Sequence, residues 1–200
     1  MIYLDLVSTG IFTLLGARMM LERQRRLFSV MVAGTLTAIG GGTVRDLLVG
    51  EGSVFWLEDF RYPVVIIIVL VLSYQGQSIF RHPPVFARVL NWFGTSTFIV
   101  VGIASTLESG ISAHLIVTMG VLTGIGGGMI RDHLLTEKEF SPPDIILISL
   151  IYFLASVAYL LISAGVSAVI CVSTIFVLLV FAEVSDAPNH IVGRLSSPHR

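Results

Sequence analysis

The sequence predicts an all-α integral membrane protein, and three observations support this: its composition, its long apolar runs and an internal repeat. Of the 200 residues, 54% are hydrophobic and only 12% are charged, and the mean hydropathy is +0.90. Soluble domains carry about 25% charged residues. The chain is therefore expected to place most of its apolar surface in lipid.

Seven apolar runs are long enough to cross a bilayer as helices, which takes roughly 20 residues each. The expected spans are Tyr3–Leu21, Leu27–Leu48, Pro63–Phe80, Val89–Leu107, Ala113–Leu134, Asp144–Ser163 and Val166–Ala182. Gly165 separates the last two runs, which would otherwise form one segment too long for a single span. A tight hairpin is expected at that glycine.

The basic residues predict an orientation in the membrane. With the N-terminus outside, nine of them face the cytoplasm and only Arg61 faces outside. The nine are Arg18, Arg23, Arg25, Arg26, Arg81, Arg88, Lys138, Arg194 and Arg200. Because cytoplasmic loops carry the excess of Lys and Arg, the N-terminus is expected outside and the C-terminus inside. A net charge of -1 gives no basic surface for nucleic acid.

The two halves of the chain repeat each other at an offset of 86 residues. The segment GTLTAIGGGTVRDLLVG (34–50) aligns without a gap with GVLTGIGGGMIRDHLLT (120–136), and ten of the 17 pairs are identical. The same offset aligns Asp5 with Asn91 and Phe12 with Phe98. Each copy holds three spans, an odd number, so the copies are expected to face opposite ways.

This repeat predicts the organisation of the whole chain. We expect a first three-helix repeat over 1–86, a second, inverted three-helix repeat over 87–163, a seventh helix over 164–184 and a flexible cytoplasmic tail over 185–200.

Three consecutive glycines lie deep in the second and fifth spans, at Gly40–Gly42 and Gly126–Gly128. Glycine has no Cβ and adopts conformations closed to other residues, so both helices are expected to be broken there, which would free carbonyl oxygens. In lipid such oxygens need protein, water or an ion as partner. We expect a monovalent cation near the carbonyls of Gly40, Gly41, Gly126 and Gly127, with the Thr37 and Thr123 hydroxyls as additional ligands.

Close helix packing is the alternative interpretation of these glycines. Small residues recur at every fourth position, as Gly34, Ala38 and Gly42 in one copy and as Gly120, Gly124 and Gly128 in the other. This spacing lets helix backbones approach closely in a membrane. The two interpretations can both hold.

Four charged residues follow the glycines within the spans: Arg45, Asp46, Arg131 and Asp132. An isolated charge at the bilayer centre costs about 2.5–3.5 kcal/mol, so these side chains should face protein or water. They either form salt bridges between the repeats, Arg45 with Asp132 and Asp46 with Arg131, or lie along an ion pathway. Phe12 and Phe98 are either packing residues or a hydrophobic gate.

The doubled motif, GGGTVRD and GGGMIRD, set in a chain of seven spans, resembles the bacterial branch of the trimeric intracellular cation channel family. The resemblance implies a homotrimer in the lipid of the bacterial inner membrane, in which each protomer has its own pore. That pore would pass potassium or sodium ions and would be kinked at the two glycine triplets. The family's Arg-Asp pairs carry over to Arg45, Asp46, Arg131 and Asp132. No cofactor and no obligatory protein partner are implied.

A secondary transporter of a small zwitterion such as glycine is the alternative function, because inverted repeats with broken helices fit both classes of protein. An enzyme is not expected, since the spans offer no arrangement of nucleophile and base.

Overall fold

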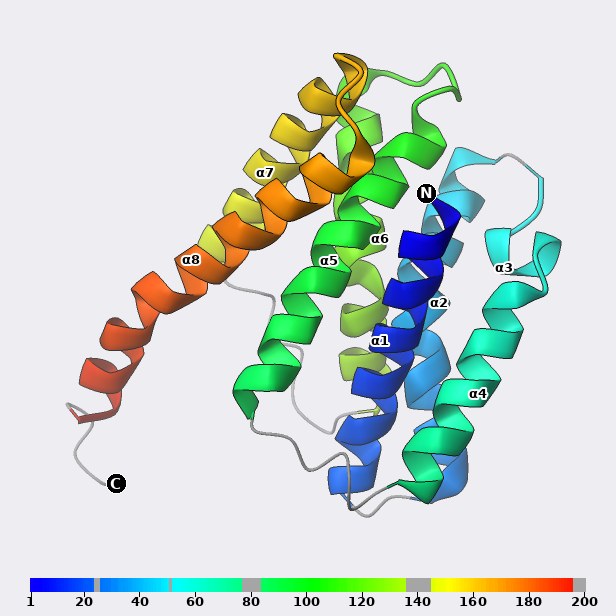
Figure 1. The fold of residues 1–200 in the computed structure, drawn as a ribbon, viewed down its shortest axis with the longest axis vertical. Coiled ribbons are helices and arrows are strands. Elements are labelled where there is room, and N and C mark those ends of the chain that lie inside the picture. The colour runs from blue at the N-terminus through cyan, green and yellow to red at the C-terminus, as the bar shows by residue number, and fades with distance from the viewer. Residues whose placement is uncertain (24–25, 51, 77–83, 136–144, 196–200) are drawn as a thin grey trace.

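The chain forms a bundle of α-helices in the computed structural model, which describes residues 1–23, 26–50, 52–76, 84–135 and 145–195 (Figure 1). The helices are α1 (Ile2–Glu22), α2 (Leu27–Val49), α3 (Phe55–Glu58), α4 (Arg61–Gln75), α5 (Pro84–Thr106), α6 (Ala113–Leu135), α7 (Ile145–Ser163) and α8 (Ala168–Leu195). These ranges contain no strand, and the predicted all-α fold is confirmed.

A helix covers most of the described part of each of the seven expected spans, whereas residues 77–80 of the third span and Asp144 of the sixth lie outside the described residues. Among the described residues, α1, α2, α5 and α6 are long and apolar enough to cross a membrane. Shorter apolar segments lie in α4, α7 and α8, at Arg61–Gln75, Leu147–Ser163 and Ala168–Phe181. That all seven segments cross the membrane stays a prediction.

Two elements differ from the expectation. A single turn, α3, lies between the second and third expected spans, where none was predicted. The tail expected to be flexible from residue 185 is helical as far as Leu195, because α8 continues past the end of the apolar run. Once a helix has nucleated, it propagates through polar residues as well. The end of hydrophobicity at Ala182 is therefore not the end of the helix.

Glycine and proline set the helix ends. Gly50 ends α2 in the left-handed conformation, with φ at 77°, and its N–H donates to the Asp46 carbonyl at 3.0 Å. Gly165, with φ at 81°, lies between α7 and α8 and confirms the predicted hairpin. Pro84 is the first residue of α5, a position at which proline costs no helical hydrogen bond.

The centre of the bundle is built from α1, α2, α5 and α6. Helix α1 packs against α2, α4 and α5, whereas α6 packs against α2, α5 and α7 (Figure 1). One apolar cluster joins α5 and α6 to α7 and α8, around Ile99, Ile103 and Leu154. A second cluster joins α1, α2 and α4 and includes Phe12 and Met20. The two outer helices α7 and α8 therefore complete only one side of the bundle.

The predicted breaks at the glycine triplets are wrong. Helix α2 is continuous through Gly40–Gly42, and α6 is continuous through Gly126–Gly128. The positive φ values among the described glycines occur at Gly50, Gly52, Gly110 and Gly165, all outside the triplets. The carbonyls of the triplets thus lie within continuous helices, and the expected carbonyl site for a cation stays a prediction.

The triplets instead let α2 and α6 cross in contact. A Cβ added to Gly41 would lie 2.5 Å from the Thr123 carbonyl oxygen, and one added to Gly127 would lie even closer to the Thr37 carbonyl oxygen. A Cβ on Gly126 would lie 3.1 Å from the Cα of Gly41. Only glycine permits such an approach, so the packing interpretation accounts for these positions.

Glycines 86 residues apart make matching contacts on the neighbouring helices. A Cβ on Gly34 of α2 would meet the Thr13 carbonyl oxygen of α1 at 3.0 Å. A Cβ on Gly120 of α6 would meet the Ile99 carbonyl oxygen of α5 at the same distance, 3.0 Å. Residues 13 and 99 are separated by the same 86 positions. The α1–α2 and α5–α6 pairs are thus packed by equivalent glycines.

The crossing predicts that glycines of one triplet respond differently to the same substitution. Gly127→Ala should lower the thermal unfolding midpoint of the purified protein, because overpacking typically costs about 1–3 kcal/mol. Gly128→Ala is the matched control, since its Cβ would meet only an Arg131 nitrogen, at 3.8 Å. Alanine there should leave the midpoint unchanged or raise it. Equal midpoints for the two variants would contradict the crossing geometry.

Candidate functional site

A buried polar stripe runs along α1 where that helix faces the centre of the bundle. Asp5, Ser8 and Thr9 lie on one helical face, one turn apart, and Phe12 follows on the same face. Their exposed fractions are 8% for Asp5, 0% for Ser8 and Thr9, and 4% for Phe12. Polar groups at this depth need partners, so the stripe is the natural place to look for a site.

The Asp5 end of the bundle, defined here as the end where α1 begins and α2 ends, holds a cluster of charged and aromatic side chains. The Tyr62 hydroxyl of α4 donates a hydrogen bond to Asp5 Oδ2. Arg45 Nε donates to Asp46 Oδ1 at 2.7 Å, and Arg45 itself is only 5% exposed. The Arg45 guanidinium carbon lies 5.6 Å from the centre of the Phe55 ring. The cluster is therefore largely closed to solvent.

The short helix α3 covers this end of α2. The Phe55 N–H donates to Asp46 Oδ2 at 2.9 Å, and the Trp56 indole N–H donates to Thr43 Oγ1 at 3.0 Å. The Phe55 ring packs directly on Gly42, where a Cβ would lie 2.6 Å from a ring carbon. Gly42 thus makes room for an aromatic ring.

Phe12 and Phe98 meet in the middle of the bundle. Their rings stack with centroids 5.0 Å apart and planes inclined by 26°. Phe12 also covers Gly94, where a Cβ would lie 3.1 Å from the ring. These equivalent residues of the two repeats form an apolar layer that separates the two ends of the α1 face.

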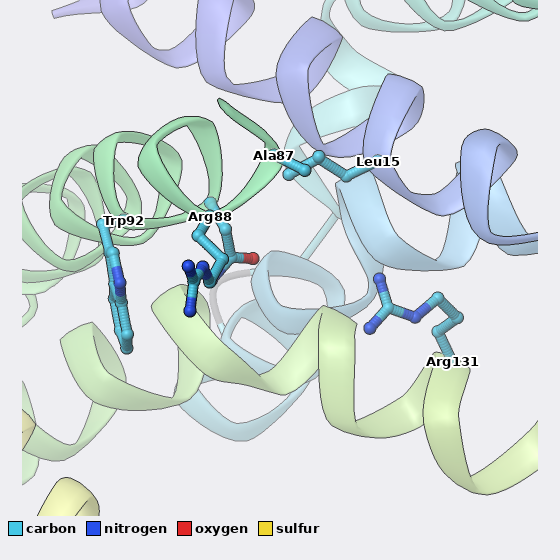
Figure 2. Close-up of a pocket in the computed structure, with 6 residues that line it drawn as sticks. Leu15, Ala87, Arg88, Trp92 and Arg131 are labelled. Carbon is cyan, nitrogen blue, oxygen red and sulfur yellow. The ribbon is translucent and has the colours of Figure 1, made fainter. Parts of the chain in front are cut away.

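A cavity of about 290 Å³ opens at the Arg131 end of the bundle, where α1 and α6 end and α5 begins. Its lining comprises Leu15, Ala87, Arg88, Asn91, Trp92 and Arg131. Figure 2 shows the guanidinium groups of Arg88, from α5, and Arg131, from α6, on two sides of this space. Two basic side chains thus border this cavity.

The predicted salt bridges between the repeats are wrong. Because Gly41 meets Thr123 and Gly127 meets Thr37, the two helices run antiparallel, and Arg45 and Arg131 lie toward opposite ends. The predicted partners, Arg45 with Asp132 and Asp46 with Arg131, are therefore about 20 Å apart along the helix axes, far beyond the reach of a salt bridge. Arg45 instead contacts its neighbour Asp46 at 2.6 Å. The Asp132 side chain lies outside the described residues.

The hydroxyls of the two predicted threonine ligands donate within their own helices. The Thr37 hydroxyl donates to the Ala33 carbonyl at 2.6 Å, and the Thr123 hydroxyl donates to the Met119 carbonyl at 2.7 Å. Each hydroxyl also lies beside a glycine of the neighbouring helix, Gly16 or Gly102. These threonines therefore act in helix packing in this conformation.

The sequence analysis did not identify four residues of the polar stripe and of the cluster at the Asp5 end: Ser8, Thr9, Tyr62 and Phe55. Asp5 carried a usable signal, because an acidic residue inside an apolar span marks a functional position by default. Ser8 and Thr9 follow Asp5 at helical spacing, which would have placed all three on one face. No sequence pattern near Asp5 identified Tyr62 or Phe55, because these residues belong to elements about 50 residues later in the chain. Across the described residues, no group of three or more His, Cys, Asp or Glu side chains is placed to hold a metal.

Comparison with known proteins places this architecture in a family. A family model described as Glycine transporter matches residues 2–77 and 88–182, and the two matched segments begin 86 residues apart. The chain is 34% identical over 139 residues to the UPF0126 inner membrane protein YadS of Escherichia coli K12, covering 68% of this chain and 66% of that protein. It is 37% identical over 138 residues to a UPF0126 membrane protein of Vibrio cholerae, covering 67% and 56%. The aligned part is 66% of the Escherichia coli protein and 56% of the Vibrio cholerae protein, less than two thirds of either.

Solved structures share the fold. The TRIC trimeric intracellular cation channel orthologue from Rhodobacter sphaeroides superposes with a TM-score of 0.80 at 28% identity, covering 92% of this chain and 95% of that one. A prokaryotic TRIC channel crystallised in 0.5 M KCl gives a TM-score of 0.78 at 19% identity. These matches confirm the resemblance carried by the doubled motif. The chain belongs to the family described as Glycine transporter, and it has the fold of the trimeric intracellular cation channels.

Proposed function

We propose that this protein is a cation channel permeable to potassium. The observation that carries the proposal is the shared fold with the Rhodobacter sphaeroides channel, which extends over 92% of the chain at 28% identity. A fold alone does not imply a function, so the site must be compatible with the same role. The buried polar stripe and the cavity at the Arg131 end are compatible with ion passage.

The pathway we propose follows α1 between the two repeats. From the Asp5 end it passes Asp5, Ser8 and Thr9, reaches the stacked rings of Phe12 and Phe98, and opens into the cavity at the Arg131 end. Stacked aromatic rings form a constriction that water leaves readily, which is a known means of gating. In this conformation the aromatic layer closes the pathway.

The Arg-Asp pairs lie at the two ends of this pathway in our proposal. Arg45 is neutralised by its contact with Asp46 and therefore presents little net repulsion to an arriving cation. Arg131 and its neighbour Asp132 occupy the equivalent position at the other end. The arginines would thus position the acidic residues and would not bind the permeant ion themselves.

The assembly we propose is a homotrimer in the bacterial inner membrane, with the Asp5 end outside. Large apolar side chains are exposed on the outer helices, including Ile67 of α4, Leu160 of α7 and Phe181 of α8. Such surfaces suit lipid or a second copy of the chain. Arg61, the single outward basic residue, pairs with Asp59 at 2.9 Å, and its guanidinium holds the pKa of that carboxyl below its usual range.

A transporter of a small zwitterion such as glycine is the second candidate, and one observation favours it. Arg88, Asn91 and Arg131 line a single cavity, and guanidinium groups are suited to a carboxylate. The cavity would then hold the substrate, and the aromatic layer would be the barrier that alternates between open and closed states.

Flux through the purified protein in sealed liposomes distinguishes the two candidates. A channel should release potassium passively down its gradient, without saturation and without movement of labelled glycine. Liposomes without protein are the control. Saturable glycine uptake with potassium retained would overturn the channel proposal and support the transporter.

The aromatic layer should limit this flux if it acts as a gate. Phe12→Leu and Phe98→Leu reduce the stacked surface while keeping apolar volume, so they should raise the rate of potassium release several-fold. Phe181→Leu is the matched control, because that ring is 70% exposed on α8 and should not affect the rate. An unchanged or lower rate in the two stacked-ring variants, with normal folding, would exclude the gate.

The proposed orientation predicts which loops a membrane-impermeant thiol reagent reaches. Cys171 is fully buried, so it should contribute little background. In intact cells with a permeabilised outer membrane, Ser53→Cys should be labelled directly. Arg23→Cys should be labelled only after the inner membrane is broken. The reverse pattern would show the opposite orientation.

A further inference from the structure

Two hydroxyl groups in the middle of the α1 face are buried without a hydrogen-bond partner. Among the described residues, Ser8 Oγ and Thr9 Oγ1 are the side-chain atoms in this condition. Both residues are 0% exposed. A buried polar group that lacks a partner costs about 1–3 kcal/mol, and an ion or an ordered water is a usual explanation.

Several other buried hydroxyls of this bundle donate to a carbonyl of their own helix. The Thr13 hydroxyl donates to the Thr9 carbonyl at 2.8 Å, and the Ser96 hydroxyl donates to the Trp92 carbonyl at 2.7 Å. Thr106 and Thr123 do the same on α5 and α6. Ser8 and Thr9 are of the same residue types on a similar helix, yet neither hydroxyl has a hydrogen-bond partner, as donor or as acceptor.

Asp5 lies on the same face one turn before these hydroxyls. Positions i, i+3 and i+4 of a helix place side chains about 5–6 Å apart at Cβ, so the three oxygen-bearing groups converge on one region. The Asp5 carboxylate is 8% exposed and accepts a hydrogen bond from the Tyr62 hydroxyl. Carboxylate and hydroxyl oxygens can replace part of the hydration shell of a monovalent cation.

The side chains around Asp5 carry a net negative charge. Arg45, Asp46 and the N-terminal amino group are the charges that act on Asp5, and Arg45 and Asp46 already contact each other. Asp5, Arg45 and Asp46 together leave one negative charge, and the N-terminal amino group opposes it with the weakest of these effects on Asp5. A charge buried at membrane depth is stabilised by an opposite charge brought to it.

The equivalent position in the second repeat differs in two of its three residues. Asn91 replaces Asp5 and Gly94 replaces Ser8, whereas Thr95 aligns with Thr9. Phe12 covers Gly94, where an added Cβ would lie 3.1 Å from the ring. Asn91 lines the same cavity as Arg88 and Arg131. The carboxylate and the serine hydroxyl thus occur only in the first of the two equivalent places.

We propose that the Asp5 carboxylate and the Ser8 and Thr9 hydroxyls bind one partly dehydrated monovalent cation at the Asp5 end of the pathway. The role of this site rests on the proposed channel function, because the bound ion would lie on the pathway just before the aromatic layer of Phe12 and Phe98. This site uses side-chain oxygens and does not depend on a break in the helices at the glycine triplets.

Cation-dependent stability of the purified protein tests the site without measuring transport. The thermal unfolding midpoint is recorded in potassium chloride, sodium chloride and N-methyl-D-glucamine chloride at matched ionic strength. A ligand that binds only the folded state raises the midpoint, so potassium or sodium should raise it relative to the large organic cation. Asp5→Asn keeps an acceptor for Tyr62 but removes the charge. It should lower the apparent affinity for the cation about tenfold or more.

The hydroxyl variants provide a sign change that a purely structural role would not produce. Ser8→Ala and Thr9→Val should raise the midpoint in N-methyl-D-glucamine, because they remove an unpartnered buried hydroxyl. In potassium the same variants should lose the cation-dependent stabilisation. Ser96→Ala is the matched control, since Ser96 is equally buried but donates within its own helix, and its cation response should equal that of the wild type.

The outcomes separate the site from the channel. Cation-dependent stabilisation that persists in Asp5→Asn, or that is absent from the wild type, would overturn the site, and the two hydroxyls would then be assigned to ordered water. Potassium flux through the wild type with an unaltered Asp5→Asn response would leave the channel in place and remove the site. Stabilisation lost in Asp5→Asn without any flux would retain the cation site and exclude the channel.

Discussion

The contact between α2 and α6 is the constraint on which the rest of the structure depends. At this crossing a carbonyl oxygen of each helix lies against a glycine of the other, Thr123 against Gly41 and Thr37 against Gly127. Four glycines lie at the crossing, namely Gly40, Gly41, Gly126 and Gly127. Because none of them has a Cβ, the two long apolar helices can come into backbone contact. In lipid, where apolar surface gains nothing by leaving the solvent, such close van der Waals contact is what holds helices together.

This crossing bears on the ion pathway that we propose. Both helices remain continuous through their triplets, so a break there does not supply oxygen ligands. Side-chain oxygens are present on α1, at Asp5, Ser8 and Thr9. The polar stripe lies beside the crossing, since α1 packs on both α2 and α5. The tightly packed crossing and the polar face of α1 therefore lie side by side in the centre of the bundle.

The two ends of the pathway differ although the repeat is symmetric in its packing. At the Asp5 end, α3 folds over α2, and Phe55 occupies the space that Gly42 leaves. Gly128 is equivalent to Gly42, but a Cβ there would meet only Arg131, at 3.8 Å. The exchange of Asp5 for Asn91 adds a difference in charge. Along the proposed pathway, a cation entering at one end would meet the Asp5 carboxylate, and one entering at the other end would meet the cavity lined by Arg88 and Arg131.

The sequence by itself determined the class of protein, the positions of the seven apolar helices, the repeat and the resemblance to a channel family. The class of protein and the helix positions follow from the hydrophobicity of neighbouring residues. The repeat follows from comparing the order of residues in the two halves of the chain. Asp5, Phe12, Phe98 and the glycine triplets could all be singled out in this way.

Only the tertiary structure decided what those residues do. A run of three glycines is compatible with a broken helix and with a close crossing, and the choice depends on a partner helix 86 residues away. The two Arg-Asp pairs align with each other in the sequence repeat. In the structure they lie toward opposite ends of the bundle, because the two helices cross antiparallel. The unpartnered hydroxyls of Ser8 and Thr9 became visible only with their surroundings in place. Hydrogen bonding and steric contact depend on distances between elements far apart in the chain, and no local pattern encodes those distances.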